Sequence, residues 1–200
     1  MGLMDRLRSV FGTAAEASAK RDADPDDLWG MSTAYMTMMA DLGYDHAGQA
    51  ALCFSGVDST DFTDTVREVE DILAAGAEET GTTAELSEDS HGYQWVILTD
   101  DDPEDLVTSV HFAADTFVER GYGSRLLAAV FGFENGGRAY WIYSFRRGAY
   151  YPFCPRTGRE RDSGAEFKLQ SVLDGELSVE SDTEYWYPLW PSRGAAHPWE

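Results

Sequence analysis

The sequence has 200 residues, of which 43% are hydrophobic and 13% aromatic, and its formal net charge at pH 7 is -21. This composition excludes an intrinsically disordered chain, and the length favours one globular domain with a sizeable core. The sequence contains no run of about 20 apolar residues that could span a bilayer, and its charge disfavours nucleic-acid binding because phosphates are repelled.

The chain has a large excess of acidic residues, and few of its basic residues are lysine. The chain has 36 acidic and 15 basic residues, and Lys20 and Lys168 are its two lysines. Acidic surfaces poor in lysine suit molar intracellular salt, where self-repulsion is screened. We therefore predict a protein of a halophilic organism; an acidic partner face or a polyanion mimic is the alternative. The opening residues lack the pattern of a secretory signal, so we expect a cytoplasmic protein that could contact the membrane surface.

Residues 1–12 have a short amphipathic helical pattern with two arginines. Such a segment suits the surface of a membrane, or it could pack as a capping helix on the domain. The residues that would contact a membrane are Leu3, Met4, Leu7, Val10 and Phe11. Residues 13–27 have no apolar period and are predicted to be a linker, so that 1–27 form an N-terminal helix and linker and 28–200 form one domain.

Four helices are predicted within that domain. The apolar period places them at residues 28–42, 61–76, 103–120 and 163–175. For the second helix we expect Asp61 as the cap and Gly76 as the end. In the third, Asp102 can cap, Pro103 suits the first helical position, and Gly121 ends the helix.

The strands are predicted from apolar runs and turn residues. Residues 49–57 suit a strand, and 82–100 suit a hairpin that turns at 89–92. Two apolar runs flank Asn135-Gly136, a dipeptide that favours a tight turn, and the break at Arg147-Gly148 returns the chain for a third antiparallel strand. The order of elements indicates an α+β fold in which an antiparallel sheet, a hairpin plus a meander, packs with helices. The aromatic tail, 183–199, is expected to wrap around the body.

Catalytic motifs are not apparent in the sequence. The four histidines are far apart, and neither glycine-rich nucleotide loops nor a GxSxG motif occur. Cys154 lies near five arginines that could favour a thiolate, but no histidine is close in sequence to serve as a base. The two cysteines, Cys53 and Cys154, are expected to be free thiols. We therefore expect no enzyme, no metal and no cofactor.

The stretch FRRGAYYPFCPRTGRERD, residues 145–162, is the exception to the acidity and is called the arginine-rich segment below. Residues 125–168 carry a net charge of +4, while the rest of the chain carries -25. These arginines could pair with the chain's own carboxylates, or they could form a docking surface together with aromatic rings. The residues of that hypothetical partner-binding surface are Arg138, Arg146, Arg147, Tyr150, Tyr151, Phe153, Arg156, Arg159 and Arg161.

Several stretches resemble the PspA-associated protein PspAB family of haloarchaea and actinobacteria. They are MGLMDRL, HGYQWVIL, SRLLAAVFGFENGGRAYWIYSFRRGAYYPFCP and YWYPLWP, and together they extend over nearly the whole chain. The resemblance implies association with PspA, a protein of the membrane (envelope) stress response, and an HtpX-type membrane protease is a further partner that it implies. The cysteine in YYPFCP departs from the family's pattern, which weakens a nucleophilic role for Cys154. The architecture is similar to that of YbjN and secretion-chaperone domains, an analogy that does not determine function.

These observations together predict a non-enzymatic accessory or adaptor protein of a PspA-type stress response. It would bind a PspA-like coiled-coil protein or the HtpX-type protease through the arginine and aromatic residues. The alternatives are a sensor that binds a small anion or another ligand, and a peripheral membrane protein. The sequence leaves the oligomeric state open.

Overall fold

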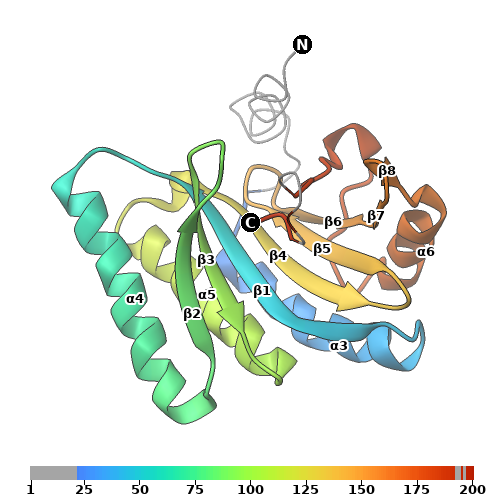
Figure 1. Ribbon diagram of the computed structural model, residues 1–200, viewed down its shortest axis with the longest axis horizontal. Helices are drawn as coiled ribbons and strands as arrows, with labels where there is room; N and C mark the ends of the chain where they lie inside the picture. Colours follow the sequence, from blue (N-terminus) through green and yellow to red (C-terminus); the bar gives the residue numbers. More distant parts are fainter. Residues whose placement is uncertain (1–21, 192–194, 196) are drawn as a thin grey trace.

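One antiparallel sheet organises the chain in the computed structural model, which describes residues 22–191, 195 and 197–200. Its six strands follow the order β2-β3-β1-β4-β5-β6, and Figure 1 shows them side by side, with helices behind. The strands are β1 Asp45–Ser55, β2 Thr83–Glu88, β3 Tyr93–Thr99, β4 Leu126–Glu134, β5 Arg138–Ser144 and β6 Ala149–Phe153. The predicted α+β fold is thereby confirmed. The predicted helix at 1–12 lies outside the described residues.

Helices cover one face of this sheet, which we call the inner face. The helical elements are η1 Pro25–Trp29, α3 Gly30–Ala40, α4 Thr60–Thr80, α5 Pro103–Glu119, the short turns η2 Gly123–Arg125 and η3 Thr183–Tyr185, and α6 Ser163–Leu173. Helix α5 packs between α4 on one side and η1 with α3 on the other. The main core lies between these helices and inner-face side chains such as Phe54, Phe131 and Trp141, all fully buried.

The ends of α4 differ from the prediction. Ser59 rather than Asp61 caps the helix, because its side chain accepts a hydrogen bond from the N–H of Phe62. The helix also continues through Gly76 to Gly81, whose φ of 87° suits a glycine at the end of a helix. Gly76 costs about 1 kcal/mol relative to alanine in a helix, which packing of the helix on α5 and β2 outweighs. In α5, Asp102 and Pro103 act as predicted.

The hairpins form where the turn residues predicted them. The strands β2 and β3 join through the turn before Tyr93, and β4 and β5 join at Asn135-Gly136, where Gly136 has a φ of 62°. Strand β6 then pairs with β5, completing the meander. Strand β1 begins at Asp45, earlier than the predicted 49, and its pairing with β4 shifts register between His46 and Ala50.

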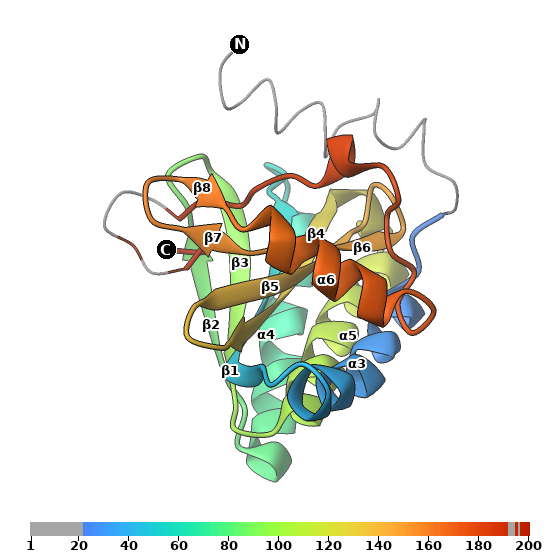
Figure 2. The same ribbon diagram turned by 90° about the vertical axis from the view of Figure 1, so that its right-hand side faces the viewer.

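The chain that follows α6, here called the C-terminal segment, covers the other face of the sheet, the outer face. Its side chains Trp186, Tyr187 and Trp199 form a second buried cluster with outer-face residues of the strands. Val179 also forms a parallel bridge to Tyr150 of the edge strand β6. Figure 2 shows α6 and this segment alongside β5 and β6. The tail wraps around the body as expected, so β5 and β6 are buried on both faces.

Candidate functional site

The aromatic residues of the arginine-rich segment belong to the core. Tyr150, Tyr151 and Phe153 lie on β6, and each is at most 1% exposed. Tyr150 packs in the inner core, whereas Tyr151 and Phe153 pack beneath the C-terminal segment on the outer face. A strand covered on both faces has no side chains left for a partner, so the prediction that these three rings form a docking surface is wrong.

Arg147 is also buried and already has its partner. Its guanidinium forms an ion pair of 2.7 Å with Glu180, and the two side chains are 3% and 4% exposed. The ring of Tyr185 lies 3.7 Å from the guanidinium carbon. Arg147 therefore fixes the C-terminal segment to the turn between β5 and β6, and it was wrongly predicted to face a partner.

Arg161 joins three parts of the chain. Its Nε donates to the carboxylate of Glu166 on α6 at 2.9 Å, and its Nη1 donates to the carbonyl of Trp186 at 2.6 Å. Glu166, whose side chain is 3% exposed, also accepts a hydrogen bond from the N–H of Cys154. Arg156, which is exposed, pairs with Asp162 at 2.5 Å. Arg147, Arg156 and Arg161 thus pair with the chain's own carboxylates, as the alternative expectation had it.

The remaining arginines do not gather at one place. Arg138 begins β5, and Arg146 lies in the turn just after the strand ends at Ser144; the six residue steps from Arg138 to Ser144 span about 20 Å at 3.3 Å per residue. The Nη2 of Arg146 donates to the carbonyl of Ser124 at 2.7 Å. Arg159 is exposed in the turn of a small hairpin, β7 Pro155–Arg156 with β8 Glu160–Arg161. The sequence predicted one surface because these residues are close along the chain. In the fold, successive side chains of a strand point to opposite faces, and residues at its two ends lie far apart.

Both thiols are in environments that suppress reactivity. Cys53 and Cys154 are free and buried. Burial raises the pKa of Cys154 to about 12, with a further contribution from the carboxylates of Glu166 and Asp162. Burial, together with Asp89, raises the pKa of Cys53 well above its usual range. Since the thiolate is the nucleophile, this geometry gives neither cysteine a catalytic environment.

We expect neither thiol to react with the thiol reagent DTNB in the native protein at pH 8. At that pH almost no thiolate forms on a group whose pKa is about 12, and burial blocks access as well. After unfolding, both thiols should react within minutes because their pKa values return to about 8.5. Absorbance at the wavelength of the released thiolate measures both states. Rapid labelling of one thiol in the native protein would contradict this picture.

The histidines and acidic runs remain separate in the fold. Across residues 22–191, 195 and 197–200, no group of three or more His, Cys, Asp or Glu side chains is placed to hold a metal ion. The carboxylates of the run at 100–102 make local hydrogen bonds: Asp100 accepts from Thr82 and from the N–H of Asp102. Within those same residues, no helix has the length and apolar character needed to cross a bilayer.

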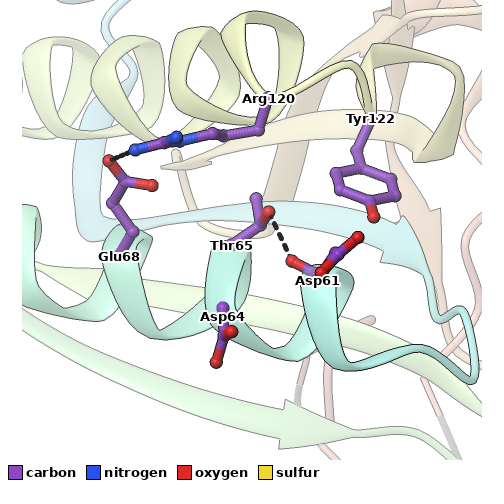
Figure 3. Close-up of a pocket in the computed structure, with 6 residues that line it drawn as sticks. All are labelled: Asp61, Asp64, Thr65, Glu68, Arg120 and Tyr122. Carbon is purple, nitrogen blue, oxygen red and sulfur yellow. Dashed lines mark hydrogen bonds and ion pairs between the residues drawn. The ribbon is translucent and has the colours of Figure 1, made fainter.

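A shallow hollow of about 390 Å³ lies between α4 and the end of α5. It is lined by Asp61, Asp64, Thr65, Glu68, Arg120 and Tyr122. Figure 3 shows the guanidinium of Arg120 directed at Glu68, with which it pairs at 2.5 Å. The hydrogen bond from Arg120 lowers the pKa of Glu68. Thr65 donates to the carbonyl of Asp61 within the helix. Arg120, the basic side chain of this lining, is therefore already paired with Glu68.

The fold therefore defines an α+β domain in which strands β4, β5 and β6 are buried on both faces and the buried Arg147 and Glu166 have ion-pair partners within the chain. This chain belongs to the PspAB family, described as PspA associated protein B, whose family model matches residues 1–199. The family's name indicates association with PspA. No curated protein gives a significant match.

The residues that sequence reasoning passed over are exposed and apolar. Trp29, Met36 and Phe112 are 40%, 69% and 49% exposed. The signal was present, since all three fall outside the apolar stripes that predicted the buried faces of their helices. Met39, which the apolar period of the helix predicted at 28–42 places with Met38 on the buried face, is 44% exposed.

Proposed function

We propose that this protein is a non-enzymatic accessory protein of a PspA-type membrane-stress response and that it acts by binding PspA. The observation that carries the proposal is the family match over residues 1–199. The buried thiols and the internally paired Arg147 and Arg161 add support, because the residues that looked most suited to chemistry contribute to the fold instead.

A test of the arginine-rich segment in PspA binding requires an arginine whose charge can be reversed without unfolding the protein. Charge reversal at Arg147 is unsuitable, because a glutamate there would lie beside the buried Glu180 and unfold the protein. Arg159 is exposed in a turn and can be reversed without disturbing the core. It therefore serves as the probe of the arginine-rich segment.

We expect the purified full-length protein to bind purified PspA of the same host in molar potassium chloride. Isothermal titration calorimetry measures the affinity, and co-elution in size-exclusion chromatography measures the stoichiometry. Arg159→Glu should bind like the wild type, because the arginine-rich segment is mostly structural. Failure of the wild type to bind PspA, in a sample shown to be folded by circular dichroism, would contradict the proposed function. Binding to an HtpX-type protease in place of PspA would make that protease the partner in the proposed function.

A further inference from the structure

Exposed apolar side chains concentrate on the helices that cover the inner face. Of the eight large hydrophobic residues exposed in the described part of the chain, six lie on η1, α3, α4 and α5. Three of these, Trp29, Met36 and Phe112, together with the exposed Thr33, make up what we call the Trp29–Phe112 face. Single exposed apolar residues need no explanation, but a contiguous group on one surface marks an interaction site.

This face is contiguous. The ring of Trp29 lies 4.4 Å from the ring of His111, and the ring of Phe112 lies 5.8 Å from that same histidine. Thr33 and Met36 follow Trp29 by four and seven residues, so they lie on the same side of the helix. The face thus runs from α5 across η1 and along α3.

The face is also held rigidly in place. Nε2 of His111 lies 2.9 Å from the carboxylate of Asp26. The hydroxyls of Tyr143 and Tyr150 donate to the carboxylate and the carbonyl of Asp27, at 2.6 and 3.2 Å. These contacts fix η1, and with it Trp29, to α5 and to the sheet. A preorganised apolar surface loses little conformational entropy when a partner binds.

The segments that carry the face are acidic. Residues 22–45 contain six aspartates and no lysine or arginine. Helix α5 carries two aspartates and two glutamates, also without lysine or arginine. An occupant that complements this surface must combine apolar side chains with flanking positive charges.

We propose that the Trp29–Phe112 face is the docking site for an amphipathic α-helix of a partner protein, whose apolar stripe is flanked by Lys and Arg. A helix laid against an apolar surface is a common mode of recognition, and the flexible Met36 can adapt to the partner's side chains. An anionic membrane is disfavoured, since the acidic rim repels its headgroups. A second copy would bring two acidic rims together. The inference deepens the proposed function, because it rests on that function for the identity of the partner.

A synthetic amphipathic helix of leucine and lysine, roughly four turns long, tests the face without any assumption about PspA. The same peptide with glutamate in place of lysine is the matched control peptide. In molar salt, where charges are screened beyond about 3 Å, we expect the full-length protein to bind the lysine peptide more tightly than the glutamate peptide through short-range ion pairs. The double variant Met36→Glu/Phe112→Glu should bind the lysine peptide at least roughly tenfold more weakly, because two carboxylates replace apolar side chains at the centre of the proposed interface and would have to be desolvated.

Phe167→Glu is the control variant, because Phe167 is 52% exposed on α6, outside the face. It should bind the lysine peptide like the wild type. Circular dichroism and thermal unfolding verify that both variants fold, which the exposure of all three side chains allows. Equal binding of the lysine peptide by the wild type and the double variant would overturn the proposal, and so would loss of binding in Phe167→Glu alone.

Other occupants give distinct and contrary outcomes. Flotation with vesicles of anionic phospholipid that Met36→Glu/Phe112→Glu abolishes would identify a membrane, and dimers lost in the same variant would identify a second copy. Peptide binding that appears only after deletion of residues 1–12 would indicate that the chain's own N-terminal segment occupies the face. Each would overturn the proposal.

The same variants separate this inference from the proposed function. If PspA binds the wild type and the double variant equally, the docking face is wrong and the proposed function stands. If the lysine peptide binds as expected and PspA does not, the face stands and PspA is the wrong partner.

Discussion

Replacing Arg147 with alanine is expected to lower the free energy of unfolding by about 3–5 kcal/mol. The substitution leaves the carboxylate of Glu180, 4% exposed, without its cationic partner in the interior. It also removes the stacking of the guanidinium on Tyr185. Since a domain of this kind is stable by about 5–15 kcal/mol, the variant should unfold at markedly lower denaturant concentration. Urea unfolding followed by circular dichroism, at constant salt, measures the change.

Two further variants test the reason for that loss. Arg156→Ala, which removes an exposed ion pair with Asp162, should change stability little. The double variant Arg147→Met/Glu180→Leu should recover most of the loss, because removing both buried charges avoids the uncompensated carboxylate. A loss in Arg147→Ala no larger than in Arg156→Ala would contradict the assignment of Arg147 as a buried structural arginine.

Trp199→Ala is expected to lower the free energy of unfolding by about 3 kcal/mol, because it removes a large buried side chain. Trp199 is 2% exposed although it lies next to the end of the described chain. Its ring stacks on His197 at 4.7 Å and lies 6.4 Å from Trp95 of β3 and 6.1 Å from Tyr140 of β5. Without it, the C-terminal segment should open locally and expose the outer face of the sheet.

A hydrogen bond between Tyr140 and His197, beside Trp199, also holds the C-terminal segment to the sheet. The hydroxyl of Tyr140 and Nδ1 of His197 are 2.9 Å apart. Burial raises the pKa of Tyr140 to about 12, and burial together with Arg138 lowers the pKa of His197. At neutral pH the phenol is therefore protonated and the imidazole neutral, and the hydrogen bond between them helps to hold the C-terminal segment against the sheet.

Hydrogen exchange of the amides in β3 and β5 measures this opening directly. Protection should fall in those strands in Trp199→Ala, while α4 and α5 retain theirs. The matched control is Trp29→Ala, which should lose less stability because Trp29 is 40% exposed. Uniform loss of protection across the whole domain would contradict local opening, and unchanged protection would remove Trp199 as an anchor.

Local patterns predicted most of the secondary structure. Asn135-Gly136 and Asp102-Pro103 marked a turn and a helix start correctly, because both depend on the conformations of a few neighbouring residues. Gly76 misled the prediction because a single glycine in a helix costs only about 1 kcal/mol, and contacts of α4 with α5 and β2 override that cost.

The candidate site was less predictable than the fold. The sequence shows that arginines and aromatic residues occur together in the arginine-rich segment, but it does not show which of them are buried. What the sequence did not reveal is that Glu180, which lies 33 residues after Arg147, returns to neutralise it. The exposed face at Trp29 and Phe112 was likewise hidden, because it combines residues 83 positions apart in the chain.

By itself, the sequence determined the α+β class, the meander, the membership in the PspAB family and the excess of negative charge. These depend on residue periodicity, turn chemistry and composition, which are properties of short stretches or of the chain as a whole. Only the tertiary structure decided which arginines are buried and which apolar side chains remain exposed. Burial depends on segments that meet after folding, and here the C-terminal segment buries Tyr151, Phe153 and Arg147 of the expected docking surface.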